Sequence, residues 1–296
     1  MMITTVEGLS MGGTWRLRIP KGDETYQGIV QSRLDLVEAQ MSAWQPLSAL
    51  CSMNAAPVGR WVSIPAETAF VIGAGLEMMK DAPQAFSILM GGAQAHEGFV
   101  PGRSCGISDN PAMLELDGLR VRRLADVAVD LNAIAKGYAA DLVASSLIKA
   151  GQHDFLIEVA GDIVARGSRP DGLPWTVAME LPIPDRMIAA RLIPLRGGAI
   201  ATSGGYRRAI GARSHLMSPV TGQPLLATDA SVAVVAATAL QADGWATALA
   251  VLGPEKGLAL AAKRGFAAAF IEQGPDGFIE RGSPAMAELL DAALLA

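Results

Sequence analysis

Residues 130–141 read DLNAIAKGYAAD and lie where one sequence pattern gives way to another. The preceding apolar run, DVAVDL at 126–131, predicts a buried strand, and residues 133–151 follow a helical period that ends in glycine. Lys136 therefore falls in a predicted first helical turn, where unpaired N–H groups favour an anion and disfavour a cation. The residues alone leave open whether this lysine is a solvated charge or holds an anion.

The patterns on either side of this stretch predict an α+β fold with mixed or antiparallel sheets and flanking helices. Strand patterns and helix patterns are both present, without the regular alternation of a parallel sheet. Helical periods occur at 25–44, 66–82, 241–253 and 254–265, and after Ser283; strand patterns occur at 12–20, 155–167 and 230–237. Residues 83–118 show no clear period, and no linker divides the chain, so we predict one domain over residues 1–296.

Composition excludes several classes of protein. The chain is 51% hydrophobic and 18% charged with a net charge of −5, and it has no basic cluster suited to nucleic acid. Its apolar runs are shorter than the roughly 20 residues that span a membrane. The N-terminal residues resemble neither a signal peptide nor a lipidation site, which predicts a cytoplasmic protein, or a periplasmic one if a leader has been removed.

Three sequence features could carry chemistry. Asp243 and Thr247 are four residues apart on a predicted helix, so their oxygens share one face and suit a hard cation. The same spacing also has an explanation without a metal. An aspartate in the first turn of a helix favours the helix dipole, and a helical threonine often bonds to the carbonyl four residues before it. Thr202 to Gly205 combine hydroxyls with glycines that allow close approach of a phosphate, although an ordinary hairpin turn would have the same composition. His215 precedes a turn and is the third feature.

Seven segments, in order along nearly the whole chain, resemble the motifs of the ApbE family, the FAD:protein FMN transferases. They are MGGTWRL from Met11, MSAWQPLSALCSMN from Met41, VAVDLNAIAKGYAADLV from Val127, LIEVAGDIVARG from Leu156, AIATSGGYRR from Ala199, SHLMSPVTGQPL from Ser214, and SVAVVAATALQADGWATAL from Ser231. The order of the motifs carries the resemblance more than any one of them.

The resemblance implies a fold related to T-fold domains, with two lobes around an FAD cleft. It also implies a Mg²⁺-dependent enzyme that transfers FMN from FAD to a Thr or Ser hydroxyl of a target flavoprotein and releases AMP. By position, the metal ligands would be Asp243, Thr247 and the main-chain carbonyl of Ala133. His215 would be the base that takes the proton of the acceptor hydroxyl, and Lys136 would lie near the pyrophosphate. The other FAD contacts would be Met11, Trp44, Ala85, Phe86, Ser87, Asp130, Thr202, Ser203 and Leu216.

The chain departs from the family pattern where carboxylates are usual, at Ser87, Gly205 and Ser218. These departures favour a second hypothesis, an FAD carrier or sensor that has lost transfer. A third hypothesis uses the same site with water as acceptor, an FAD pyrophosphatase that gives FMN and AMP. Release of AMP from FAD separates the enzymes from the carrier.

Overall fold

A computed structural model describes residues 3–20, 25–183, 186, 188–206 and 209–294. Arg207 and Arg208, at the end of the motif that begins at Ala199, lie outside the described residues. Within the described part of the chain, no helix is both long enough and apolar enough to cross a membrane.

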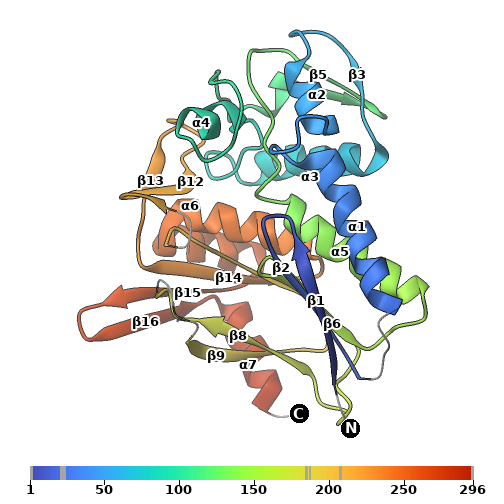
Figure 1. Ribbon diagram of the computed structural model, residues 1–296. Coiled ribbons are helices and arrows are strands. Elements are labelled where there is room, and N and C mark those ends of the chain that lie inside the picture. The colour runs from blue at the N-terminus through green and yellow to red at the C-terminus, as the bar shows by residue number, and fades with distance from the viewer. Residues whose placement is uncertain (1–2, 21–24, 184–185, 187, 207–208, 295–296) are drawn as a thin grey trace.

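An eight-stranded sheet forms the centre of the molecule (Figure 1). The strands run in the order β1-β2-β6-β7-β10-β14-β15-β16, and every neighbouring pair is antiparallel. Their bounds are β1 Thr4–Ser10, β2 Gly13–Ile19, β6 Phe155–Val159, β7 Asp162–Arg166, β10 Gly197–Gly204, β14 Ala230–Ala236, β15 Ala267–Gly274 and β16 Gly277–Gly282. The predicted α+β class with an antiparallel sheet is confirmed.

Both faces of the central strands are buried, so these strands are almost entirely apolar. In β10, Ala199 and Ala201 pack into the main core while Ile200 packs into a second core. In β14, Val232 and Ala233 divide between the two cores in the same way. The period of two that defines a strand thus assigns alternate residues to the two cores.

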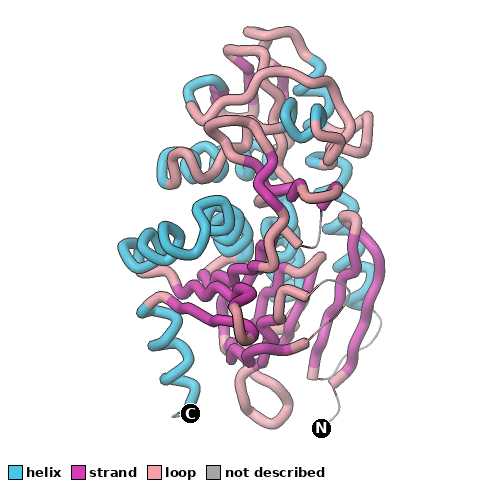
Figure 2. Tube along the Cα trace, turned by 90° about the vertical axis from the view of Figure 1, so that its left-hand side faces the viewer, coloured by secondary structure: helices cyan, strands magenta, loops and turns pink. Residues whose placement is uncertain are grey.

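Different elements cover the two faces of the sheet (Figures 1 and 2). The face toward the main core carries α1 (Thr25–Met41), α5 (Ala135–Lys149) and α6 (Ala239–Arg264). The opposite face carries the hairpin of β8 (Trp175–Glu180) and β9 (Ala189–Leu195), with α7 (Pro284–Leu294).

Helix α6 is broken near its middle. Gly253 has φ 76° and ψ 173°, and Pro254 follows it without an N–H to continue the helical bonds. The two halves match the two helices that the sequence predicts, at 241–253 and 254–265. The half before the break is mostly buried, whereas the half after it is mostly half-buried or exposed.

The remaining elements lie on the side of α5 and α6 away from the sheet (Figure 1). They are α2 Ala49–Ala55, α3 Ala66–Asp81, α4 Gly91–His96, the 3-10 helix η1 Pro111–Met113, β3 Val62–Ser63, β4 Leu114–Asp117, β5 Arg120–Arg123, β11 Ala209–Ile210, β12 Arg213–Met217 and β13 Pro224–Leu226. Segment 83–118, which has no clear period in the sequence, contains three of them but no long helix or strand.

The strand predicted at 126–131 is wrong. Val127, Val129 and Leu131 are buried as the alternation indicates, but the segment forms no ladder: it makes an isolated bridge to Gly106 and single backbone bonds to Ile88 and Gly91. The Asn54 side chain takes the place of a neighbouring strand, since it donates to the Val129 carbonyl at 2.8 Å and accepts from the Val129 N–H at 2.9 Å. An amide side chain can satisfy a buried backbone segment as a strand would, and the local sequence carries no sign of it.

Candidate active site

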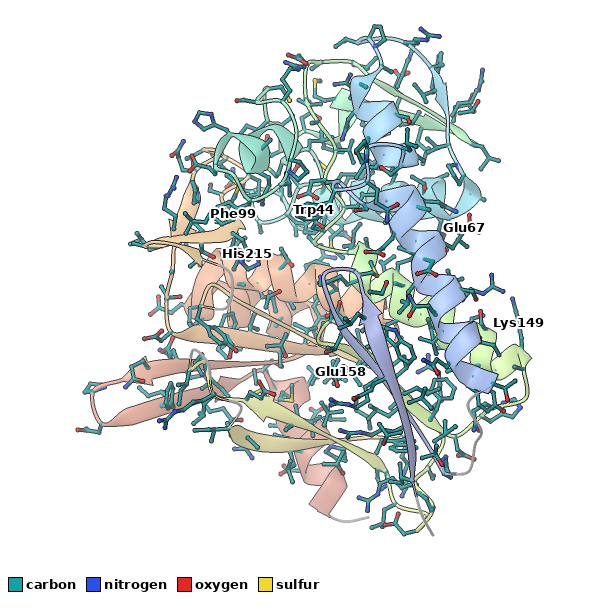
Figure 3. The ribbon with its side chains drawn as sticks, in the orientation of Figure 1. Trp44, Glu67, Phe99, Lys149, Glu158 and His215 are labelled. Atoms are coloured by element: carbon teal, nitrogen blue, oxygen red, sulfur yellow. The ribbon has the colours of Figure 1, made fainter. Side chains whose placement is uncertain are left out.

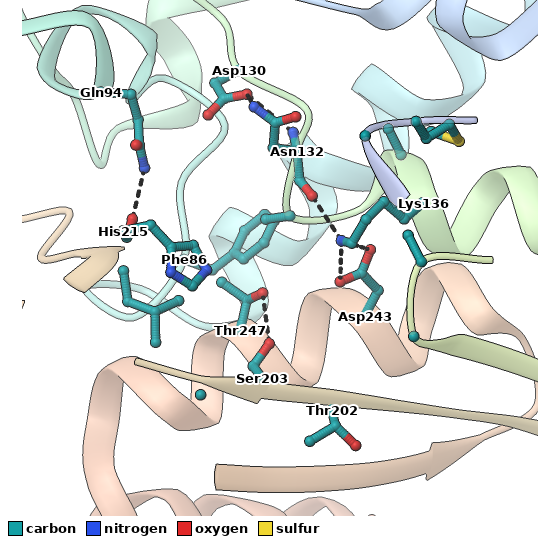
Figure 4. Close-up of a pocket in the computed structure, with 18 of the residues that line it drawn as sticks. Phe86, Gln94, Asp130, Asn132, Lys136, Thr202, Ser203, His215, Asp243 and Thr247 are labelled. Atoms are coloured by element: carbon teal, nitrogen blue, oxygen red, sulfur yellow. Dashed lines mark hydrogen bonds and ion pairs between the residues drawn. The ribbon is translucent and has the colours of Figure 1, made fainter. Parts of the chain in front are cut away.

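A cavity of about 790 Å³ is lined by the first half of α6, by strands of the sheet, by β8, and by segments on the side of α6 away from the sheet (Figures 3 and 4). The residues that line it include every sequence-predicted site residue: Met11, Trp44, Ala85, Phe86, Ser87, Asp130, Ala133, Lys136, Thr202, Ser203, His215, Leu216, Asp243 and Thr247. The fold therefore brings these separate segments to one place, while their individual roles stay predictions.

The first turns of α5 and α6 touch, and this contact builds one wall of the cavity. A Cβ atom on Gly137 would lie 2.2 Å from the carbonyl oxygen of Ala239, so only glycine fits at this point. The Asp141 carboxylate accepts the N–H groups of Ala239 and Leu240, both at 2.9 Å. These bonds satisfy two of the unpaired N–H groups at the start of α6 and fix the two helices to each other.

Lys136 and Asp243 form an ion pair across this junction (Figure 4). The Lys136 ammonium lies 2.9 and 3.1 Å from the two Asp243 oxygens, and the Gly137 N–H donates to the same carboxylate at 3.2 Å. Asp243 is only 3% exposed. The first-turn lysine is therefore a partly buried, paired charge rather than a solvated one, and it holds a carboxylate.

Asp162 adds a second carboxylate that the sequence motifs contain but to which we assigned no role. It is 3% exposed, and its Oδ2 lies 3.7 Å from the Lys136 ammonium. Burial raises the pKa of Asp162 well above its usual range, and the neighbouring Asp243 carboxyl raises it further while Lys136 opposes the shift. No donor among the described residues bonds to its Oδ2, and a hydrogen bond with the Asp243 carboxyl, which requires a shared proton, adds to the rise in pKa.

Two hydroxyls lie next to these charges. The Ser203 Oγ and the Thr247 Oγ1 are 3.3 Å apart, so strand β10 and helix α6 meet there through polar atoms. Thr202 projects from the opposite face of β10, as its place beside Ser203 in a strand requires (Figure 4). The two predicted hydroxyls therefore lie on opposite faces of β10, and only that of Ser203 faces Thr247.

The loop before α5 brings main-chain oxygens to the cavity. Asp130 turns back on its own loop, where its Oδ1 accepts from the Asn132 N–H at 3.0 Å and from the Asn132 side chain at 2.6 Å. The carbonyl that contacts the Lys136 ammonium, at 3.0 Å, belongs to Asn132. Ala133, whose carbonyl is the predicted metal ligand, also lines the cavity.

Met11 reaches the cavity because it sits in a tight turn. Met11 and Gly12 join β1 to β2 as a two-residue loop with φ values of 53° and 72°, the signature of a type I′ hairpin turn. A positive φ is unusual for methionine, and the Met11 N–H donates to the Glu38 Oε1 at 2.9 Å. Glu38 is a positioning residue that we did not infer from the sequence, because nothing in helix α1 indicates its partner.

His215 lies across the cavity on β12, a strand of a separate three-stranded sheet. The Gln94 side chain on α4 donates to the His215 carbonyl at 3.0 Å (Figure 4). Arg213 forms an ion pair with Glu97, which follows α4. Contacts between β12 and α4 thus position His215, and Gln94 is a second residue that sequence reasoning missed.

Two of the three positions that lack the family carboxylates are serines whose hydroxyls have local hydrogen-bond partners. The Ser87 Oγ donates to the Ser108 carbonyl at 2.6 Å and accepts from the Leu89 N–H at 3.0 Å. The Ser218 Oγ accepts from the Thr221 N–H at 3.3 Å and so keeps the hydrogen bond of a turn.

Gly205 has little room for a carboxylate. A Cβ atom at this position would lie 3.0 Å from the Ser214 Oγ and 3.3 Å from the Ser214 Cβ. Ser214 is fully buried, so it has little freedom to give way. The replacement of an acidic residue by glycine therefore matches the packing of β12 against this turn.

The charges around Lys136 fit a divalent cation. Two buried carboxylates face one ammonium, and one carboxylate oxygen has no partner among the described residues. Carboxylate and hydroxyl oxygens are the ligands that Mg²⁺ prefers. The described part of the chain holds no group of three or more His, Cys, Asp or Glu side chains arranged for a metal, so the remaining ligands would be hydroxyl, carbonyl or substrate oxygens.

Comparison with known proteins gives a consistent result. The sequence profile of the ApbE family matches residues 11–271. FAD:protein FMN transferases of Klebsiella pneumoniae and Escherichia coli K12 are 32% and 30% identical, over 95% of this chain and 87% and 88% of theirs. The apo structure of the flavinyl transferase ApbE of Pseudomonas stutzeri matches with a TM-score of 0.86 at 33% identity, over 97% of this chain and 96% of that one. The Vibrio cholerae flavin transferase ApbE matches with a TM-score of 0.85 at 28% identity, over 97% of this chain and 99% of that one.

Proposed function

The chain belongs to the ApbE family, and we propose that it transfers FMN from FAD to a Thr or Ser hydroxyl of a target flavoprotein, with release of AMP. The observation that carries the proposal is the pair of Lys136 and Asp243 in the wall of a cavity whose opposite side holds His215, with the Asp162 carboxylate 3.7 Å from the Lys136 ammonium. A cluster of charges suits a pyrophosphate, and an imidazole suits the proton of an attacking hydroxyl.

FAD would fill the cavity with its flavin and adenine against the apolar lining, which includes Met11, Trp44 and Phe86. Lys136 would face the pyrophosphate from the α5 side, with its charge held in place by Asp243. Asp243, Thr247 and the Ala133 carbonyl would hold Mg²⁺. When bound, Mg²⁺ supplies positive charge that stabilises the transferring phosphoryl group.

The reaction balances with the residues present. The acceptor hydroxyl oxygen attacks the phosphorus of the FMN half, and the bond from that phosphorus to the bridging oxygen breaks. The bridging oxygen leaves with AMP and its electron pair. His215 takes the proton of the hydroxyl and passes it to solvent, and the charge of Lys136 opposes the negative charge that gathers on the phosphates.

We further propose that residues 1–296 act as one functional domain. The cavity takes residues from Met11 to Val251, so neither half of the chain would contain the whole site. The predicted arrangement of two lobes around the FAD is part of this proposal.

Incubation with FAD, Mg²⁺ and an acceptor flavoprotein domain tests the function. Transfer should give a fluorescent acceptor band on a denaturing gel together with AMP in the supernatant, and an acceptor whose target Thr is replaced by Ala should stay dark. Equal amounts of AMP and unbound FMN without a band would indicate the pyrophosphatase. Binding of FAD without any AMP would indicate the carrier.

A further inference from the structure

The position of Asp162 is set by a hairpin turn. Ala160 and Gly161 form the two-residue turn between β6 and β7, with φ values of 49° and 98°, and Asp162 is the next residue, paired with Val159. The turn and the sheet therefore fix where this carboxylate lies. The Asp162 Oδ2 accepts no hydrogen bond within the described structure, so no N–H or O–H donor of the fold accounts for its burial.

A buried carboxylate oxygen without a partner is costly, and such an atom in a native structure calls for an explanation. A water would be a sufficient explanation in a purely structural site. Here the neighbouring cation gives another one, since the Lys136 ammonium is 3.7 Å away, within ion-pair range but beyond hydrogen-bond distance.

The ammonium is at present engaged elsewhere. It contacts both oxygens of Asp243, at 2.9 and 3.1 Å, and the Asn132 carbonyl at 3.0 Å. Asp243 is also the predicted metal ligand, so a divalent cation and the ammonium would compete for one carboxylate. Lysine carries its charge on a flexible four-carbon stem and can shift by about 1 Å without moving its helix.

We propose that Asp162 receives the Lys136 ammonium when a divalent cation takes Asp243. Lys136 moves from the Asp243 oxygens to the Asp162 Oδ2, and the cation and the ammonium then lie side by side, each with its own carboxylate. Asp162 is in this sense a positioning residue, which acts on the phosphates through Lys136. The inference rests on the proposed function, because it requires the cation at Asp243.

The charge balance agrees with this arrangement. When Asp162 is ionised, the two carboxylates and the ammonium sum to −1, which favours the entry of a divalent cation. With the cation bound the cluster carries +1, which favours a pyrophosphate. Without Asp162, the ammonium and the cation would face each other with only one carboxylate between them. Their repulsion would weaken the binding of the cation.

A double-mutant cycle on Mg²⁺ binding tests the proposal without FAD or an acceptor. The proteins are the wild type, Asp162→Asn, Lys136→Met and the double variant, titrated with Mg²⁺ alone at constant ionic strength by calorimetry and by the midpoint of thermal unfolding. Asp162→Asn should lower the affinity for Mg²⁺ about tenfold. This is the lower end of the range observed when a residue that orients a metal ligand is replaced. Lys136→Met should raise the affinity for Mg²⁺, because it removes the ammonium that competes for the Asp243 carboxylate. In the Lys136→Met background, Asp162→Asn should change Mg²⁺ affinity by less than about twofold.

Each alternative gives a different outcome. If Asp162 binds the metal directly, Asp162→Asn weakens Mg²⁺ equally in both backgrounds, which overturns the proposal. If Asp162 is only structural, the substitution lowers the unfolding midpoint without Mg²⁺ and leaves the Mg²⁺ affinity unchanged, which also overturns it. Asp141→Asn is the matched control, a half-buried carboxylate on the same pair of helices that does not contact Lys136 in the described structure.

The cycle also separates this inference from the proposed function. A wild type that transfers FMN but whose double-mutant cycle shows no coupling refutes only the role of Asp162. A wild type that does not respond to Mg²⁺ at all refutes the cation at Asp243 and the role of Asp162 with it. A crystal structure with Mg²⁺ gives the direct check, since the Lys136 ammonium should then lie within about 3 Å of the Asp162 Oδ2.

Discussion

The two walls of the cavity are built in different ways. The wall of α5 and α6 belongs to the main core: Gly137 touches the backbone of α6, Asp141 binds its first N–H groups, and Asp243 is buried. The wall that carries His215 is a sheet of three short strands. It packs on α4 through a small apolar cluster, one ion pair and the side chain of Gln94.

This difference matches what each wall has to do. Charges that stabilise a phosphoryl group must be held to within a fraction of an ångström, and a packed core provides that accuracy. A protein acceptor must enter and leave, so the wall that takes its proton benefits from fewer contacts. We therefore expect substitutions in the first wall to damage stability and chemistry together, and substitutions in the second to damage turnover with little loss of stability.

The largest effect is expected at the helix junction. Gly137→Ala puts a methyl group 2.2 Å from the Ala239 carbonyl and should lower the free energy of unfolding by more than about 3 kcal/mol, or prevent folding, as overpacking against rigid backbone does. Urea unfolding measures it. Gly28→Ala on α1, where nothing lies within 4 Å, is the matched control and should stabilise by about 0.5 to 1 kcal/mol. Equal stability of Gly137→Ala and the wild type would show that the junction can open.

The next effect concerns chemistry in the same wall. Asp243→Asn leaves Lys136 without its nearest counter-ion and removes the predicted metal ligand, so transfer should fall at least about 100-fold. Quantified acceptor fluorescence and AMP release measure the rate, and the Mg²⁺ dependence should disappear. Asp229→Asn, an exposed carboxylate, should leave the rate unchanged. A Mg²⁺ titration of Asp243→Asn like that of the wild type would remove Asp243 from the metal site.

A smaller effect is expected in the wall of His215. Gln94→Met keeps the size of the side chain but loses the bond to the His215 carbonyl, a contribution of about 1 kcal/mol. Turnover should fall about three- to tenfold at saturating FAD, with an unchanged unfolding midpoint and unchanged Mg²⁺ affinity. Gln273→Met, on the exposed side of β15, is the control. Loss of FAD affinity in parallel with turnover would show that Gln94 binds the substrate instead.

The smallest effect is a dependence of stability on pH. Burial raises the pKa of Asp141, and the N–H groups of Ala239 and Leu240 oppose the shift. A raised pKa means that the folded state holds the proton more tightly than the unfolded state. Stability from this group is therefore complete below the unfolded pKa of about 4 and is lost as the pH rises through the folded value.

Asp141→Asn removes this titration. Urea unfolding between pH 4 and pH 7 gives the difference in unfolding free energy between the wild type and the variant, and this difference should fall as the pH rises. A difference that grows as the pH rises would mean that the charged carboxylate, and not the protonated one, stabilises α6.

The sequence predicted the parts of the site that belong to ordered motifs. Lys136, Asp243, Thr247 and His215 line one cavity, as expected. The strand predicted at 126–131 is wrong because the Asn54 side chain and single bonds to irregular segments, rather than a neighbouring strand, bind the backbone there. Local periodicity reports burial correctly but does not say which group satisfies the backbone.

The positioning residues were beyond sequence reasoning for a similar reason. Asp162, Glu38 and Gln94 act on partners that only the tertiary fold brings near. Gly137 was visible as a glycine in a predicted helix, but its contact with Ala239 depends on how two helices cross. Spacing along one element predicts which side chains share a face, whereas contacts between elements need the fold.

The break at Gly253 also has a consequence for how α6 opens over time. The turns before it are buried between the sheet and α5, and the turns after it are mostly half-buried or exposed. Because the helical bonds are interrupted there, fraying that starts at Arg264 has a natural end point. Amide protons beyond Pro254 should exchange with solvent sooner than those of Ala242 to Leu249. The half of the helix that holds Asp243 and Thr247 then stays closed while its other half exchanges.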